Sequence, residues 1–268
     1  MNWKQTLFWS FSAAAIFYYF LLFGVFVFVG QEEMQLFIPE WWYIREFLFQ
    51  PGGFCAVAGQ WIIQYYRQPM SAVVFHTVLL VGCGFMVYRI LRCFSDKTYL
   101  LFLSLLPVLY LVKMSIHGEY LVDGTVGVVL MLLALSVSLK VRRAGSIAGY
   151  GIASTLFLCG LTGFLSVCYA FLYTLLALLR YKTSRQRLAA SACLIPALFI
   201  YLFSGWLGIP VPLSDGWMPE AYLEIQRLPH YYMYRVWTFF TLSIVGVALF
   251  ARFVPVIGEK SKWMDRVA

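Results

Sequence analysis

Long apolar runs separated by short polar segments make up most of this chain. A helix needs about 20 apolar residues to cross a bilayer, so such runs predict membrane-spanning helices. Eight are expected, near residues 7–30, 70–93, 98–115, 120–140, 145–161, 163–180, 187–207 and 234–257. The predicted fold is therefore an all-α membrane protein of about eight transmembrane helices, forming a single polytopic domain over residues 1–268.

Two segments between the expected spans are long enough to carry structure of their own. Residues 31–69 contain "FIPEWWYIREFLFQPGG", where Trp41, Ile44 and Leu48 form an apolar stripe at helical spacing. A second aromatic stretch, "FCAVAGQWIIQYYRQP", follows directly. Because Trp and Tyr concentrate at membrane–water interfaces, we expect amphipathic interfacial helices here, either as a connector or as a platform for a lipid-linked substrate. The other segment, 208–233, is a predicted outer loop rich in Pro and Gly.

Composition supports a membrane protein. Hydrophobic residues make up 62% of the chain and charged residues only 12%, whereas a soluble domain carries roughly 25% charged residues. The first apolar run is too long for the hydrophobic part of a signal peptide, so we expect it to remain as the first transmembrane helix.

The positions of Lys and Arg predict the orientation. With both termini in the cytoplasm, 15 of the 20 cations lie inside, which the positive-inside rule favours. The five left outside are Arg45, Arg67, Lys113, Arg227 and Arg235. Topology thus accounts for the net charge of +8, and nucleic acid is not a predicted partner.

Acidic residues gather on the opposite side, where nine of the 12 are expected. Glu32 and Glu33 end the first apolar run, so they either mark the water boundary or do chemistry on a membrane-bound substrate. Glu119 and Asp123 form a second pair in the loop between the third and fourth spans. If the fourth helix begins near residue 118, these two carboxylates share one helix face.

Basic side chains on the same side are candidates for binding an anionic substrate group. The set comprises Arg67, Lys113, His117, Arg227, His230 and Arg235. His76 differs from these residues because it lies in the middle of an apolar run. We expect it to be a core histidine that is hydrogen-bonded to a neighbouring helix.

The order of first span, acidic outer loop and interfacial helices resembles the GT-C superfamily of membrane glycosyltransferases. In that superfamily a carboxylate in this loop is the catalytic base, and the sugar donor is a polyprenyl phosphate. The resemblance implies that Glu32 and Glu33 supply the base. It also implies a divalent metal, Mg²⁺ or Mn²⁺ as in some members, at Glu119 and Asp123.

The stretch "FLFQPGGFCAVAGQWIIQYYRQP" also resembles a group of uncharacterised bacterial inner-membrane proteins. These proteins share a "PGG…Q(F/Y)(F/Y)..P" signature after the first span. This second resemblance implies a multi-pass protein of the bacterial inner membrane.

Three functions fit these features. The first is a transferase that uses a polyprenyl-phosphate-linked sugar at the outer face of the membrane. The others are a non-catalytic subunit or scaffold that binds other membrane subunits of an envelope complex, and a transporter of small solutes or lipids. A transferase needs Glu32 or Glu33 beside a cavity open to lipid, whereas a scaffold leaves them on a solvated surface. A transporter places its charges near mid-membrane.

Overall fold

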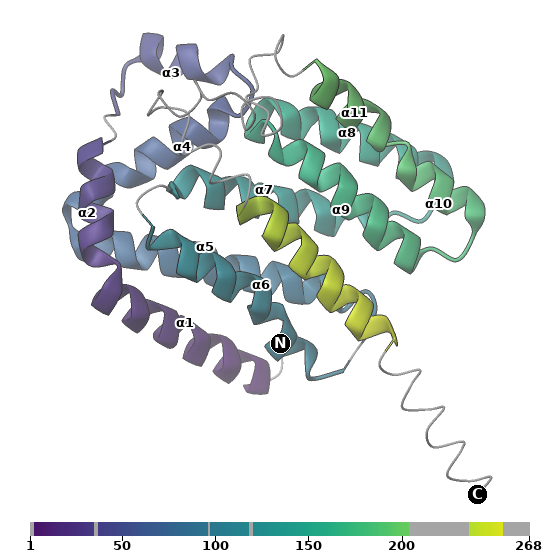
Figure 1. The fold of residues 1–268 in the computed structure, drawn as a ribbon, viewed down its shortest axis with the longest axis horizontal. Helices are drawn as coiled ribbons and strands as arrows, with labels where there is room; N and C mark the ends of the chain where they lie inside the picture. Colours follow the sequence, from purple (N-terminus) through teal and green to yellow (C-terminus); the bar gives the residue numbers. More distant parts are fainter. Residues whose placement is uncertain (1–2, 35–36, 96, 118–119, 204–235, 254–268) are drawn as a thin grey trace, which may run out of the picture.

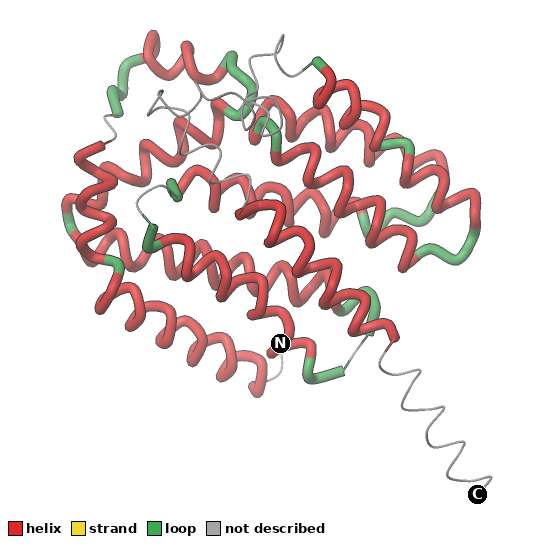
Figure 2. The backbone as a smooth tube through the Cα atoms, viewed as in Figure 1, coloured by secondary structure: helices red, strands yellow, loops and turns green. Residues whose placement is uncertain are grey.

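A computed structural model of the chain describes residues 3–34, 37–95, 97–117, 120–203 and 236–253. All the regular secondary structure in these ranges is helical (Figure 2). The elements are α1 (Trp3–Phe23), α2 (Val25–Met34), α3 (Trp41–Leu48), α4 (Gly53–Ile63), η1 (Gln64–Arg67), α5 (Pro69–Leu91), α6 (Leu100–Ser115), α7 (Val122–Ser138), α8 (Ala144–Thr162), α9 (Leu165–Arg180), α10 (Ser184–Ser191), α11 (Leu194–Leu202) and a last helix, Val236–Phe253.

Four of these helices are long and apolar enough to cross a membrane: α1, α5, α8 and Val236–Phe253. Three more, α6, α7 and α9, are apolar but shorter. The expected all-helical membrane protein is therefore confirmed, whereas the expected eight spans are not. Helices α6, α7 and α9 have 16, 17 and 16 residues, at or just below the lower end of the range of about 17–25 residues for a spanning helix.

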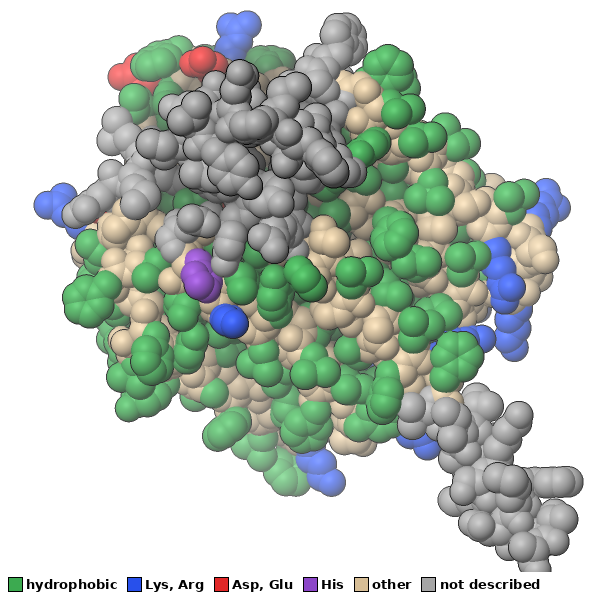
Figure 3. All heavy atoms as spheres, viewed as in Figure 1, with side chains coloured by type: hydrophobic (Ala, Val, Ile, Leu, Met, Phe, Trp, Pro, Cys, Tyr) green, Lys and Arg blue, Asp and Glu red, His purple; other side chains and the backbone are tan. Residues whose placement is uncertain are grey.

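The helices pack side by side in a bundle (Figure 1). One half is built on α5, which packs against α1, α6 and α7, and the other half contains α8, α9, α10 and α11. Helix α7 joins the halves because it contacts α5 on one side and α8 and α9 on the other. The outer surface is largely hydrophobic, as expected for side chains that face lipid (Figure 3).

The predicted first span, 7–30, is two helices rather than one. Helices α1 and α2 meet at Gly24, where a Cβ atom would lie 2.8 Å from the Phe28 ring. Glycine therefore leaves room for that ring to fold back over the helix. The backbone hydrogen bonds continue through the joint, from Gly24 N–H to the Phe20 carbonyl at 2.8 Å and from Phe28 N–H to the Gly24 carbonyl at 3.0 Å.

The predicted seventh span, 187–207, also divides, into α10 and α11. Pro196 lies near the start of α11 and has no N–H to donate to the carbonyl four residues earlier, that of Ala192. The helix breaks at that carbonyl. The part before the break is polar, with Arg185 and Arg187, so α10 begins as an exposed helix rather than as an apolar span.

The segment with α3 and α4 attaches to the bundle through a contact between two glycines. Gly52 and Gly163 both have left-handed backbones, with φ of 83° and 61°. Gly52 donates its N–H to the Gly160 carbonyl at 3.1 Å. A Cβ atom on Gly52 would lie 3.3 Å from the Gly163 nitrogen, so this approach of two turns requires glycine. Gly163 ends α8 and leads into the turn before α9.

Replacing Gly52 by Ala should destabilise the protein by about 1–2 kcal/mol, because alanine is strained in a left-handed backbone. The contact with Gly163 should add to the loss. The measurement is the thermal unfolding midpoint of the detergent-purified chain. Gly160→Ala is the matched control, since a Cβ atom at Gly160 meets nothing within 4 Å. Equal midpoints for the two variants would show that the glycine contact does not hold this segment in place.

Candidate functional site

A fully buried polar pair lies where η1 meets α5. The Tyr66 hydroxyl and His76 Nε2 are 2.7 Å apart, and both side chains have no exposed surface. The Phe28 ring stacks on the imidazole at 4.3 Å between ring centroids, with 10° between the ring planes. Burial raises the pKa of the Tyr66 phenol, so the hydroxyl stays neutral and can share a proton with the imidazole. The expectation that His76 is a hydrogen-bonded core histidine is confirmed.

A second buried bond joins α2 to the loop before α7. Gln31 Nε2 donates to the Tyr120 carbonyl at 3.0 Å, although the two residues are 89 positions apart. The Tyr120 hydroxyl accepts a hydrogen bond from Thr125 in α7 at 3.3 Å. These bonds bring the end of α2 beside the beginning of α7. We call Gln31, Tyr66, His76, Tyr120 and Thr125 the buried polar cluster.

Two atoms of this cluster have no hydrogen-bond partner within the described ranges. They are Gln31 Oε1 and His76 Nδ1, and both are buried. An unpaired polar atom in an apolar interior costs roughly 1–3 kcal/mol. His76 stacks on Phe28, and Gln31 is three residues after Phe28 in α2. Both unpaired atoms therefore lie where α2 packs against α5.

Glu32 follows Gln31 directly and is half-buried near the end of α2. Within the described part of the chain, its carboxylate forms no hydrogen bond or ion pair. Such a carboxylate remains available to accept a proton or a hydrogen bond from a ligand. The side chain of Glu33 lies outside the described residues.

Asp123 lies in the first turn of α7 and is half-buried. One carboxylate oxygen accepts the Gly124 N–H at 2.7 Å. Helix α4 packs closely over this turn, since a Cβ atom on Gly59 would lie 2.7 Å from Asp123 Cβ. Burial, and then the negative charge of Asp123, raise the pKa of the nearby Cys55 thiol, which therefore stays protonated.

The expected start of the fourth helix near residue 118, on which the pairing of Glu119 with Asp123 on one helix face depended, differs from the observed start of α7. Helix α7 begins at Val122, and Leu121 before it is extended, with φ of −82° and ψ of 154°. Glu119 itself lies outside the described residues. Among the residues that the structure describes, no three His, Cys, Asp or Glu side chains come together as a metal site. Because Glu119 lies outside the described residues, the expected metal site at Glu119 and Asp123 stays a prediction, and we derive no chemical step from a metal.

Three of the predicted substrate-binding residues are described, and all three are exposed. Arg67 ends η1, Lys113 lies in the last turn of α6, and His117 follows that helix. Arg67 directly follows Tyr66 of the buried polar cluster, and His117 is three residues before Tyr120. The other predicted residues, Arg227, His230 and Arg235, lie outside the described residues.

A comparison with protein families identifies the chain. The model of DUF6057, a family of unknown function, matches residues 1–266. The chain belongs to this family. No curated protein and no solved structure matches it. Membership of DUF6057 carries no activity with it, so the function is argued from the site alone.

Part of the buried polar cluster of this DUF6057 chain has no clear signal in the sequence. Tyr66 was visible only as one of several aromatics, and Gln31 as a residue beside two glutamates. A sequence signal for Tyr66 did exist, because a histidine in an apolar run needs a polar partner and Tyr66 is 10 residues away. No local pattern links Gln31 to Tyr120, since that contact depends on how α2 packs beside α7.

Replacing Tyr66 by Phe should lower the free energy of unfolding by about 1–3 kcal/mol, because His76 would lose its buried partner. Unfolding of the detergent-purified protein measures the loss. Tyr65→Phe is the matched control, because the neighbouring Tyr65 side chain is exposed. If the pair is coupled, Tyr66→Phe and His76→Phe together should cost less than the sum of the single changes. Strict additivity would count against the pair.

Proposed function

We propose that this chain is a membrane glycosyltransferase of GT-C layout that uses a polyprenyl-phosphate-linked sugar. The observation that carries the proposal is the Gln31–Tyr120 hydrogen bond. It brings the acidic end of α2 beside the loop that leads to Asp123, so two acidic segments far apart in sequence meet at one end of the bundle. Along the chain, helices α3 and α4 come after α2 and before α5, which is the order of elements in the GT-C arrangement.

In the proposed reaction an acceptor hydroxyl attacks the anomeric carbon of the lipid-linked sugar. A carboxylate of Glu32 or Glu33 takes the hydroxyl proton as the new carbon–oxygen bond forms. The bond between the anomeric carbon and the phosphate oxygen breaks, and the polyprenyl phosphate leaves with its negative charge. Arg67 and Lys113 are exposed cations that can stabilise that charge, and Arg227, His230 and Arg235 complete the proposed set. A metal at Glu119 and Asp123 stays a prediction.

The proposal includes a topology. All eight apolar segments cross the bacterial inner membrane, with α6, α7 and α9 as short spans and α10 with α11 as the seventh. Both termini are cytoplasmic, and α3 and α4 lie at the outer face. Support comes from the distribution of Lys and Arg, which concentrates cations at the proposed inner end.

A second candidate is a non-catalytic subunit of an envelope complex. The observation in its favour is that Asp123 uses its carboxylate to bind the first turn of α7, which is a structural role. The two candidates differ in one expected result. A transferase should lose its sugar-transfer activity when Glu32 or Glu33 is replaced, whereas a non-catalytic subunit has no such activity to lose.

Replacing the catalytic base should lower the rate of sugar transfer by about 10²-fold or more, which is the usual contribution of a general base. The two substitutions to test are Glu32→Gln and Glu33→Gln, and the one that removes the base should have this effect. The assay incubates the purified full chain with a polyprenyl phosphate carrying radiolabelled hexose and follows release of label from the lipid. Glu259→Gln is the control, because this residue is predicted to lie in the cytoplasmic tail. Wild-type release no faster than that of Glu32→Gln/Glu33→Gln would overturn the transferase proposal and leave the subunit.

Reporter fusions should confirm the orientation. Alkaline phosphatase, which is active only outside the cytoplasm, should be active when inserted at Gln50, between α3 and α4. Green fluorescent protein fused after Ala268 should fluoresce, since the C-terminus is proposed to be cytoplasmic. An inactive insertion at Gln50 would contradict the topology.

A further inference from the structure

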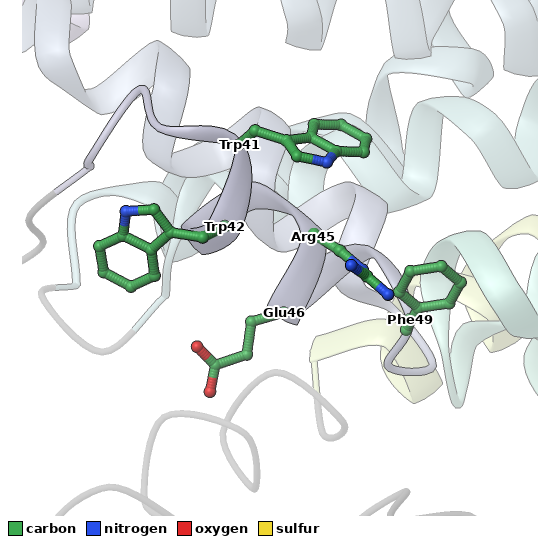
Figure 4. A pocket seen from close by; sticks show the side chains of 5 residues that line it. All are labelled: Trp41, Trp42, Arg45, Glu46 and Phe49. Carbon is green, nitrogen blue, oxygen red and sulfur yellow. The ribbon is translucent and has the colours of Figure 1, made fainter.

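Helix α3 carries an open hollow lined by exposed side chains. The hollow has a volume of about 400 Å³ and is lined by Trp41, Trp42, Arg45, Glu46 and Phe49 (Figure 4). These positions have the spacing of one broad helix face. None of them belongs to the acidic site described above.

The aromatic walls of this hollow are exposed, with 69% of Trp41, 58% of Trp42 and 82% of Phe49 accessible. The opposite side of α3 packs chiefly against α4, where the Tyr43 hydroxyl donates to Gln60 Oε1 at 3.1 Å. The Trp42 indole N–H is already satisfied by the Glu40 carboxylate at 2.8 Å. Its ring can therefore enter an apolar environment without losing a hydrogen bond.

The hollow also presents one charge of each sign. The Arg45 guanidinium carbon lies 5.8 Å from the centroid of the Phe49 ring, while the Glu46 carboxylate points away from Arg45 (Figure 4). In the described part of the chain, neither side chain forms an ion pair. Both charges thus remain free for a ligand that carries the complementary pair.

We propose that this hollow binds the zwitterionic headgroup of a membrane phospholipid, with phosphatidylethanolamine as the fitting class. The planar guanidinium of Arg45 matches a phosphate and can donate two parallel hydrogen bonds to it. The Glu46 carboxylate accepts hydrogen bonds from the ammonium group, and the Trp42 face attracts the same cation. Trp41 and Phe49 contact the glycerol and upper acyl region, at the depth where Trp is enriched in membrane proteins. This inference does not depend on the transferase proposal.

A phospholipid whose headgroup carries a phosphate but no ammonium group fits this hollow less well. Phosphatidylglycerol would place an anion beside Glu46 with no ammonium group to balance it. The surface therefore predicts a preference between two phospholipids rather than general affinity for a negatively charged bilayer.

Native mass spectrometry of the detergent-purified full chain tests the preference. Phosphatidylethanolamine and phosphatidylglycerol with identical acyl chains are added in equal amounts, and the ratio of the two bound species is measured. Wild type should favour phosphatidylethanolamine by about fivefold, the ratio given by one partly exposed ion pair. Glu46→Gln should abolish the preference, and the conservative Glu46→Asp should retain it. Arg45→Gln should weaken binding of both lipids.

Lys97→Gln is the matched control, because it removes an exposed charge remote in sequence from α3. It should leave the ratio unchanged. All the altered side chains are exposed, and unfolding midpoints equal to wild type confirm that each variant is folded. A preference that survives in Glu46→Gln, or its absence in wild type, would overturn the assignment to a zwitterionic headgroup.

Discussion

Polar groups buried in an apolar bundle need partners, and in this protein those partners hold the short helices in place. The bond from Gln31 fixes α2 to the loop before α7, and the Tyr66–His76 pair fixes η1 to α5. The backbone bond from Gly52 fixes the start of α4 to α8. The helices between α1 and α5 are too short to be stable alone, so these three attachments add to the packing of α4 on α7 and of α2 on α5.

The same attachments separate two surfaces with different chemistry. Glu32 and Asp123 belong to segments tied into the bundle, where geometry is fixed by buried bonds. The hollow on α3 lies on the far side of a helix that touches mainly α4. The proposed acidic site and the proposed lipid-binding hollow can thus coexist within one stretch of about 100 residues, each supported by different contacts.

Apolar periodicity predicted the fold class and most of the helix positions. Helices α5, α8 and α9 begin and end within a few residues of the expected spans. It could not reveal the division at Gly24, where the cause is the placement of one aromatic ring. The candidate site was harder to predict from the sequence, because Gln31 and Tyr120 meet only through the packing of α2 beside α7. The sequence pointed to the acidic segments, but their relative position came from the structure.

The length of α7 has a consequence for how the protein sits in lipid. Its 17 residues extend over about 26 Å. The hydrocarbon core of a bilayer is thicker, at about 30 Å. At its first turn the missing length is covered by α4, which packs on Asp123 through Gly59. If α7 spans the membrane as we propose, α4 rather than bilayer thinning compensates for the hydrophobic mismatch at that end. In the proposed topology, the acidic first turn of α7 is therefore recessed below the level at which a full-length spanning helix would reach water.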